Sequence, residues 1–427
     1  MRLETDLPPD PAWLARRLAG RPGLAVLRSD ARGALGADDA ATSFVASDPV
    51  ETSSARVPPA GVTVPGWAGR PAAPRWVGYL PYEAFRSLER SGWTPKEERA
   101  APWVESPLWY RYDAVVRIEH ALGRVVVEGD DPDAVGRTLA RIRDGKHAYH
   151  PAVWGPLNTG PDASHTAAVG RVLERIAAGD VYQVNLARRF VASFRGDELD
   201  FFDRLFERAP SPYGFFLAAG DHHVAGASPE LAVHVDERGA LRTGPIKGTR
   251  LRGTDAVTDA ALAAELDRSP KERAELTMAI DLHRNDLGRV ARAGSVHVVR
   301  SGELRPGKTV WSRVAEVRAT LDAGCTPADL VESALPCGSV TGAPKVRAME
   351  IIAETERDRR GLYTGAFGHV GRDGSLVLAV AIRTAVLRGD ELEYFAGGGI
   401  VWGSDPERET EETWWKVRQL TQSVRAD

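Results

Sequence analysis

The sequence predicts an α+β protein, and three observations lead to this fold class. Segments before residue 150 are rich in Val, Ile, Tyr and Trp, a composition that suits strands packed on one face. After residue 165, amphipathic helical patterns alternate with short apolar strand patterns. Two stretches rich in Pro and Gly, 57–75 and 144–165, are typical of loops or linkers. We therefore expect a β-rich N-terminal region at 1–150 and a larger α+β domain at 165–427.

Composition and charge exclude several classes of protein. The 427 residues, 43% of them hydrophobic, can bury a large core. The net charge of -4 and the scattered Lys and Arg residues predict neither a nucleic acid nor a membrane partner. Because no apolar run approaches the ~18 residues that span a bilayer and residues 1–10 lack a signal-peptide core, we expect a cytoplasmic protein. Two cysteines are too few for a disulfide framework.

Individual elements follow from local patterns in chain order. In the N-terminal region, strands are predicted at 109–119 and 124–127. In the second region, a helical period at 166–178 predicts a helix, and apolar runs at 375–387 and 391–396 predict strands.

Two further helices have clear start signals. Ser269, Pro270 and Glu272 occupy the N-cap, first and third helical positions of a capping box, which predicts a helix to about residue 289. Asp405 and Pro406 can open the last helix in the same way.

Both of these helices present a pair of carboxylates on one face, Glu272 with Glu275 and Glu409 with Glu412. If the two faces meet across a cleft, they could hold Mg²⁺, which uses few protein carboxylates and keeps waters. Solvated helix faces are the alternative. Since 59 of 427 residues are acidic, this spacing arises by chance about eight times. Capping by Glu272 and pairing of Glu412 with Lys416 also explain two of the four acids.

A lysine and a run of glycines are further candidates. Lys247 lies between Pro245 and Gly248 in a turn-like setting, and a lysine with a lowered pKa can act as a nucleophile. A solvated turn lysine is the alternative. The glycines at 397–399 follow a strand that we expect to end at Ala396, and they predict either an anion-binding nest or a tight turn.

Several familiar motifs are absent from the sequence. The segment 338–345 has the wrong spacing for a phosphate-binding loop, and Pro344 removes an amide that such a loop needs. There is no His-Glu-x-x-His, no Gly-x-Ser-x-Gly and no Gly-x-Gly-x-x-Gly sequence. Hydrolases and dehydrogenases of these types are therefore disfavoured.

Taken in order, these segments resemble the chorismate-utilising enzymes, the family of anthranilate synthase component I, aminodeoxychorismate synthase component I, isochorismate synthase and salicylate synthase. The resemblance covers about 166–422 and implies a sandwich of two large antiparallel sheets, with outer helices and a central active-site cleft. The matching stretches are 179–186 (GDVYQVNL), 228–230 (SPE), 245–249 (PIKGT), 281–289 (DLHRNDLGR), 338–345 (GSVTGAPK), 381–384 (AIRT) and 397–401 (GGGIV).

The resemblance also assigns roles to individual residues. It implies that Glu275 and Glu412 bind Mg²⁺ and that Glu272 and Glu409 support the ion through water. It further implies a group of positions that hold the carboxylates and nearby groups of chorismate, a task suited to charged donors and bare amides. These positions are Arg383, Tyr363, Ser339, Gly399, Lys416 and Thr249.

Lys247 indicates one branch of the family. The residue at this position is usually alanine in anthranilate synthases and lysine in aminodeoxychorismate synthases, where it is thought to attack ring C2 as the C4 hydroxyl leaves. Ammonia then enters at C4 and displaces the lysine. Asn185 also resembles the residue found at this position in the aminodeoxychorismate synthases. Glu230 matches the acid that protonates the leaving hydroxyl, a role that needs a raised pKa. The resemblance thus implies formation of 4-amino-4-deoxychorismate for p-aminobenzoate and folate synthesis.

Two alternatives remain open at this point. Ammonia could instead enter at C2, as in anthranilate or 2-amino-2-deoxyisochorismate synthases. The chain could also bind chorismate without turnover, because Ser312 stands where relatives usually have a histidine. The sequence shows no glutamine amidotransferase domain, so the resemblance implies that a separate glutamine amidotransferase subunit supplies ammonia within a heteromeric complex.

Overall fold

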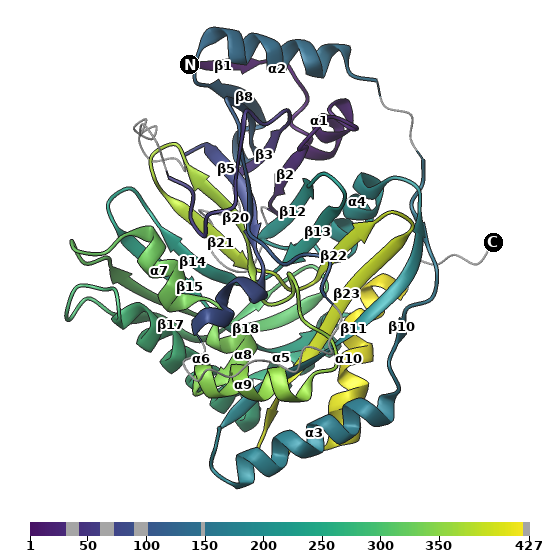
Figure 1. The fold of residues 1–427 in the computed structure, drawn as a ribbon, viewed down its shortest axis with the longest axis vertical. Coiled ribbons are helices and arrows are strands. Elements are labelled where there is room, and N and C mark those ends of the chain that lie inside the picture. The colour runs from purple at the N-terminus through teal and green to yellow at the C-terminus, as the bar shows by residue number, and fades with distance from the viewer. Residues whose placement is uncertain (31–41, 60–71, 89–100, 147–149, 422–427) are drawn as a thin grey trace.

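The computed structural model describes residues 1–30, 42–59, 72–88, 101–146 and 150–421. Within these ranges, two large sheets form a sandwich and helices cover its outer faces (Figure 1). All strand pairs between described residues are antiparallel. The predicted α+β sandwich is confirmed.

Strands from both halves of the chain make up each sheet. In the first sheet, the described strands lie in the order β1 (Arg2–Thr5), β8 (Arg124–Gly129), β7 (Ala114–Glu119), β3 (Thr42–Ala46), β2 (Ala25–Arg28), β12 (Tyr213–Ala218), β13 (His223–Ser228), β22 (Thr384–Arg388), β23 (Glu391–Val401), β11 (Gln183–Arg195) and β10 (Asn158–Thr159), with β9 (Val153–Trp154) and β19 (Gly342–Ala343) also on β11. In the second sheet, the order is β16 (Ile246–Leu251), β18 (Val310–Thr320), β15 (Ala240–Gly244), β14 (Leu231–Val235), β21 (Leu376–Val380), β20 (Ala366–Gly371), β5 (Pro74–Leu80), β6 (Leu108–Arg111) and β4 (Glu51–Ser53), with β17 (His297–Pro306) on β18.

Helices on the two outer faces bury separate hydrophobic clusters. The first sheet is covered by α1 (Pro11–Arg17), α2 (Pro132–Asp144), α4 (Glu198–Arg208) and α10 (Pro406–Thr421), and α3 (Asp162–Ala177) packs beside α10 and β11. The second sheet is covered by α6 (Pro270–Gly288) and α7 (Pro327–Ala334), with α5 (Ala256–Arg268) beside β16. α8 (Gly338–Thr341) lies between α6 and β11, and α9 (Lys345–Thr355) packs on β11 and β19 of the first sheet. Short 3-10 helices lie at Tyr82–Leu88 and His120–Leu122.

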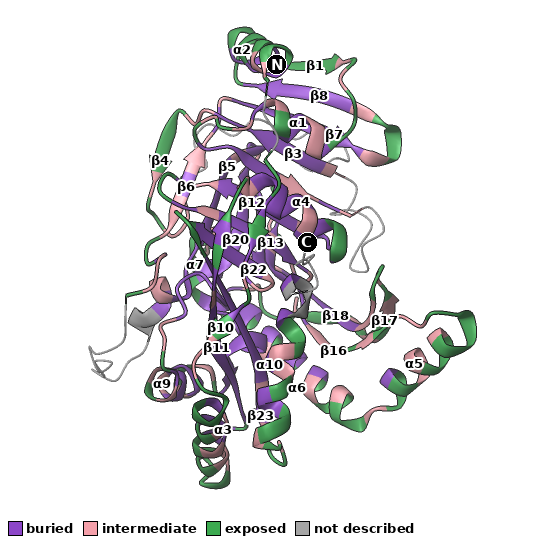
Figure 2. Cartoon of the chain, turned by 90° about the vertical axis from the view of Figure 1, so that its right-hand side faces the viewer, coloured by how far each residue is buried: buried purple, intermediate pink, exposed green. Residues whose placement is uncertain are grey.

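The interior of the sandwich is an apolar layer to which both sheets contribute. Phe215 of β12 stacks on Phe367 of β20 with ring centroids 4.6 Å apart. Figure 2 shows both sheets as mostly buried, whereas α5 lies at the surface and exposes most of its length. Among the described residues, no helix is long and apolar enough to cross a membrane.

Two predicted strands are each divided between the sheets. The segment 109–119 forms β6 in the second sheet and β7 in the first, and the segment 375–387 forms β21 in the second sheet and β22 in the first. In the second case the chain turns at Arg383, whose φ of 52° interrupts the extended conformation. Alternating hydrophobicity continues across such a turn, so the pattern alone did not show the change of sheet.

The predicted boundary near residue 150 lies next to residues 147–149, which fall outside the described ranges. Strands from before this point pair directly with strands from after it, as β2 does with β12 and β5 does with β20. The division into 1–150 and 165–427 stays a prediction. The predicted loop at 57–75 lies partly outside the described residues, and the helix predicted at 166–178 begins earlier, at Asp162.

Candidate active site

A lysine, a serine and a glutamate predicted for the site lie in direct contact. Lys247 on β16 donates a hydrogen bond from Nζ to the backbone oxygen of Ser339, over 2.8 Å. Ser339 on α8 donates from Oγ to Oε1 of Glu230, over 2.6 Å, and Glu230 lies between β13 and β14. Residues about 90 positions apart in sequence therefore form one connected group.

Burial sets the protonation of this group. Glu230 is 3% exposed, and burial raises the pKa of its carboxyl to about 7, although Ser339 and Lys247 favour the ionised form. Burial also lowers the pKa of the Lys247 amine, against the attraction of Glu230 and Glu275. A carboxyl that titrates near neutral pH can act as a general acid, and an amine with a lowered pKa is a better nucleophile.

Both predicted pairs of carboxylates lie near enough to this group to interact with it electrostatically. Burial raises the pKa of Glu275 on α6, while Lys247 and Lys271 lower it and the charges of Glu272 and Glu412 raise it again. Glu412 on α10 is therefore near enough to Glu275 on α6 to act on its carboxyl. The attraction of Lys416, 2.7 Å away, lowers the pKa of Glu412. Burial raises the pKa of Glu409, which accepts a hydrogen bond from Ser404 over 2.7 Å.

The helix starts are largely as predicted, with one correction. The Ser269 side chain accepts a hydrogen bond from the Glu272 amide over 3.3 Å, and Asp405 caps α10 through the amide of Arg408. The reciprocal half of the predicted capping box does not form between described residues, because the Glu272 carboxylate instead pairs with Arg250 at 3.4 Å. The capping role of the Glu272 side chain was therefore wrong.

The carboxylates provide suitable donors for a hard cation without forming a complete site by themselves. Among the described residues, no three Asp, Glu, His or Cys side chains lie close enough together to hold a metal ion. Glu275 lies 3.8 Å from Lys271, and Glu412 lies 2.7 Å from Lys416, so each carboxylate faces a positive charge that a cation would replace. Mg²⁺ takes few protein carboxylates and completes its shell with water and anionic substrate, which fits these two side chains. Binding of Mg²⁺ stays a prediction.

Arg383 is a free cation at the site. Its side chain is partly buried and has no ion pair or hydrogen bond with any described residue. Burial lowers the pKa of its guanidinium. Its φ of 52° is unusual for a residue with a side chain, and such backbone strain is concentrated at functional sites. An unpaired guanidinium on a strained turn is suited to binding an anion.

The glycines at 397–399 continue β23, so the predicted strand end at Ala396 and the tight turn were wrong. The strand pairs with β11 as far as Val401. A Cβ at Gly397 would lie 2.4 Å from the backbone oxygen of Leu186, and a Cβ at Gly398 would lie 3.2 Å from Oε2 of Glu409. The absence of side chains thus makes room for the neighbouring strand and for the acids of α10.

Gln183 is a site residue that the sequence reasoning missed. A Cβ at Gly399 would lie 2.3 Å from its Nε2 atom, so the amide side chain covers this glycine. The Nε2 atom is buried without a hydrogen-bond partner among the described residues. The sequence does show a polar residue, Gln183, at the start of an apolar strand. The direction in which its side chain points could not be predicted, because it depends on how β11 pairs with β23.

The remaining predicted residues differ in their placement. Tyr363 is buried and stacks on Phe395 with centroids 5.5 Å apart, and Lys416 donates to the backbone oxygen of Gly397 over 2.7 Å. Thr249 is exposed on β16 opposite Ser312 of β18, and its hydroxyl has no hydrogen bond with a described residue. The predicted roles of these residues toward substrate stay predictions.

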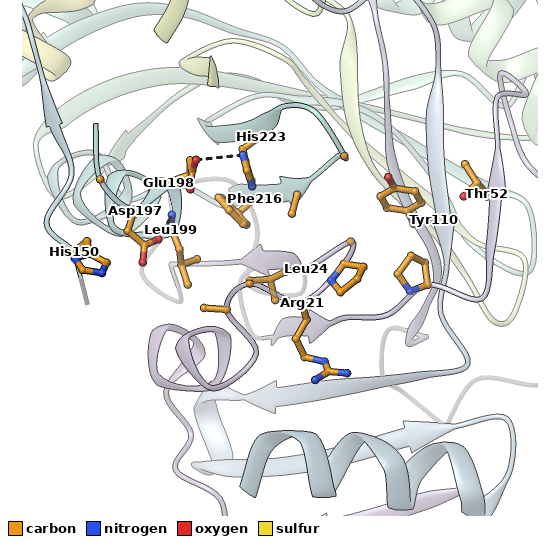
Figure 3. A pocket seen from close by; sticks show the side chains of 18 residues that line it. Arg21, Leu24, Thr52, Tyr110, His150, Asp197, Glu198, Leu199, Phe216 and His223 are labelled. Carbon is orange, nitrogen blue, oxygen red and sulfur yellow. Dashed lines mark hydrogen bonds and ion pairs between the residues drawn. The ribbon is translucent and has the colours of Figure 1, made fainter. Parts of the chain in front are cut away.

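A separate pocket of about 810 Å³ lies away from this group (Figure 3). Its walls come from both sheets and from the start of α4, and they include Leu24, Tyr110 and Phe216. Glu198 and His223 point toward one another at 3.6 Å on one side. None of the predicted site residues lines this pocket, so it is not the predicted cleft.

The fold is an α+β sandwich, and its candidate site contains a buried acid, an amine and a guanidinium. Such a site is suited to a small anionic substrate. The chain matches the family model described as chorismate binding enzyme over residues 31–422 and belongs to that family. The predicted family is thereby confirmed.

Relatives and a solved structure similar to this chain are named as anthranilate synthases. Component 1 from Streptomyces coelicolor is 39% identical, over 82% of this chain and 72% of its own, and component 1 from Thermus thermophilus is 38% identical, over 82% and 77%. The structure of anthranilate synthase component I from Streptococcus pneumoniae aligns with a TM-score of 0.78 at 28% identity, covering 90% of this chain and 92% of that one. The isochorismate synthase MenF from Escherichia coli, 17% identical with a TM-score of 0.75 over 99% and 93%, shares the fold.

Proposed function

We propose that this chain is the component of a chorismate-aminating synthase that binds chorismate and uses ammonia. Membership of the chorismate binding family supports the substrate, and the relatives named as anthranilate synthases support amination. The unpaired Arg383 guanidinium supplies the charge that a chorismate carboxylate needs. Glu275 and Glu412 would hold Mg²⁺, which would supply positive charge to the bound anion.

The position of amination is proposed to be ring C4, and Lys247 is the observation that carries this choice. Its Nζ lies 2.8 Å from the backbone oxygen of Ser339, whose hydroxyl contacts Glu230. Protonated Glu230 gives its proton to the C4 hydroxyl, which leaves as water while the neutral amine of Lys247 bonds to C2 and both ring double bonds shift by one position toward C4. Ammonia then bonds to C4, both double bonds shift back, and the C2–N bond breaks with its electron pair returning to the Lys247 amine. The product is 4-amino-4-deoxychorismate.

Anthranilate formation is the second candidate, and the names of the relatives favour it. In that reaction ammonia bonds to C2 directly, and the elimination of pyruvate follows. We rank C4 amination first because Lys247 stands at the position where the resemblance implies alanine in anthranilate synthases, and its amine contacts the group that contains Ser339 and Glu230.

A glutamine amidotransferase subunit is the proposed partner. The relatives are named component 1, which supports a multi-component enzyme. Ammonium salts should replace this partner in vitro, because the chorismate-binding chain uses ammonia itself.

The test compares wild type, Lys247→Ala and the control Lys308→Ala, whose exposed lysine lies outside the site. Each protein is incubated with chorismate, Mg²⁺ and concentrated ammonium salt, and products are resolved by mass and by conversion with aminodeoxychorismate lyase. We expect wild type and the control to form a product that the lyase converts to p-aminobenzoate, and Lys247→Ala to lose it. Fluorescent anthranilate would assign C2 amination instead, and unchanged chorismate would indicate binding without turnover.

A further inference from the structure

Arg360 is a buried cation that contacts several segments of the site at once. Its side chain is 1% exposed. The guanidinium donates to the backbone oxygen of Val340 over 3.1 Å, to the backbone oxygen of Asn185 over 2.5 Å and to Oγ1 of Thr364 over 3.0 Å. These three acceptors lie on α8, on β11 and on the connection that precedes β20.

Each contacted position is adjacent to a residue predicted to hold chorismate. Val340 follows Ser339, and Thr364 follows Tyr363, whose ring centre lies 5.7 Å from the guanidinium carbon. Asn185 is paired with Gly399 in the β11–β23 register. The amide of Thr364 donates over 2.9 Å to the backbone oxygen of Ala381, two residues before Arg383. One guanidinium is thus linked to the segments that carry Ser339, Gly399, Tyr363 and Arg383.

Two of these segments need to be held in place. Thr364 has a φ of 61° and Arg383 a φ of 52°, and residues with side chains adopt this left-handed conformation only when surrounding contacts impose it. The hydrogen bond from Arg360 to Thr364 is one such contact. Loss of it would let the connection relax and would move the start of the Arg383 turn.

Glu356 fixes the orientation of the guanidinium. It accepts two hydrogen bonds from Arg360, over 2.6 and 2.9 Å, and its Oε1 also accepts the amide of Ala187 on β11 over 2.8 Å. Both charges are therefore paired and fully hydrogen-bonded, which is the condition for a rigid buried network. A lysine has one compact ammonium and could not reach the same acceptors in these directions.

We propose that Arg360 is a positioning residue, which sets the relative placement of the four chorismate-binding segments without touching the substrate. This inference rests on the proposed function only in that chorismate must bind in this cleft; it does not depend on whether C2 or C4 is aminated. Because the guanidinium is enclosed by protein, its effect must act through Ser339, Gly399, Tyr363 and Arg383.

The test uses Arg360→Lys with Arg117→Lys as the matched control. Arg117 is also 1% exposed and pairs with a buried glutamate, Glu128, at 2.6 Å, but it lies on β7 away from the site. Chorismate dissociation constants are measured by calorimetry, kcat and KM by chorismate consumption, and melting temperatures for all proteins. We expect Arg360→Lys to bind chorismate about tenfold or more weakly and to lose about 100-fold in kcat/KM, since small misplacements at a site have effects of this size. The control should stay within about twofold while its melting temperature falls.

Unchanged chorismate affinity in folded Arg360→Lys would overturn the proposal, as would an equal loss in the control. If Arg360→Lys does not fold, Thr364→Val decides, because it keeps the side-chain shape and removes the hydroxyl that accepts from Arg360. That hydroxyl also donates to the backbone oxygen of Tyr363 over 2.6 Å, so this variant tests the whole link from Arg360 to Tyr363. That variant should bind chorismate several-fold more weakly, and wild-type affinity would again refute the role. Calorimetry distinguishes failure of the Arg360 proposal from failure of the proposed function. If the wild type binds chorismate without turnover, the affinities of wild type and variants can still be compared.

Discussion

Replacing Glu230 by glutamine should make the protein more stable at alkaline pH and less active. The fold raises the pKa of this carboxyl from 4.5 to about 7, chiefly through burial. Since the folded-state pKa lies above the unfolded one, the protonated acid stabilises the fold below about pH 4.5, and this contribution is lost as the pH rises to about 7. The shift corresponds to about 3 kcal/mol at pH 8 and to roughly 1 kcal/mol near pH 5.5.

Glutamine is uncharged at every pH and can still accept the hydrogen bond from Ser339. The free energy of unfolding would be measured by urea denaturation with tryptophan fluorescence at pH 5, 6, 7 and 8. The difference between Glu230→Gln and wild type should grow across this range toward about 3 kcal/mol. In parallel, chorismate consumption by the variant should fall by about 100-fold or more, because the leaving hydroxyl loses its acid.

A matched control is Glu316→Gln, since Glu316 is similarly buried but is paired with Arg318 and Arg300 on the second sheet. This substitution should destabilise the protein, because it removes one partner of a buried ion pair. A pH-independent difference for Glu230→Gln would show that the carboxyl is not held protonated by the fold. Full activity in that variant would show that Glu230 is not the acid.

Two further predictions concern the anion and cation sites. Arg383→Gln should raise the KM for chorismate by about 10- to 100-fold, the value of a charge-assisted hydrogen bond, with an unchanged melting temperature because the guanidinium has no partner among the described residues. An unchanged KM in steady-state assays would contradict this role. Glu275→Gln should raise the Mg²⁺ concentration for half-maximal activity by about tenfold or more, whereas Glu174→Gln on the exposed face of α3 should not. If both variants reach half-maximal activity at the same Mg²⁺ concentration, Glu275 is not a ligand of the ion.

The sequence predicted individual elements and chemistry better than their spatial relations. The caps at Ser269 and Asp405 are local features, so the starts of α6 and α10 could be placed from a few residues. The opposite case is 375–387, which continues one hydrophobic pattern through two sheets. The turn at Arg383 separates them, and its backbone oxygen accepts a hydrogen bond over 3.0 Å from Ala227, a residue far away in the sequence.

The site residues, like the strands, could be predicted where the signal is local and not where it depends on spatial neighbours. Lys247 and the acids of α6 and α10 could be named because the motifs around them resemble those of a family, although their spacing alone is common. Gln183 could not, because its importance depends on its side chain reaching Gly399, two positions along the neighbouring strand from its own partner Val401. Arg360 was missed for a related reason, since a single arginine among 55 basic residues has no distinguishing sequence pattern.

The protonation of the site bears on whether the protein turns chorismate over or only binds it. Binding of a dianion needs a cation such as Arg383 and bare amides such as that of Gly399. A protein carboxyl beside the ligand, such as that of Glu230, adds nothing to the binding of an anion. Glu230 is nevertheless buried within reach of Ser339 and Lys247, at a cost to the folded state above pH 7. Burial likewise disfavours the charged form of the Lys247 amine. Burial thus raises the pKa of the acid and lowers that of the amine beside it, and such opposed shifts are typical of groups that transfer a proton and form a bond. This pairing supports the proposal of turnover over binding alone.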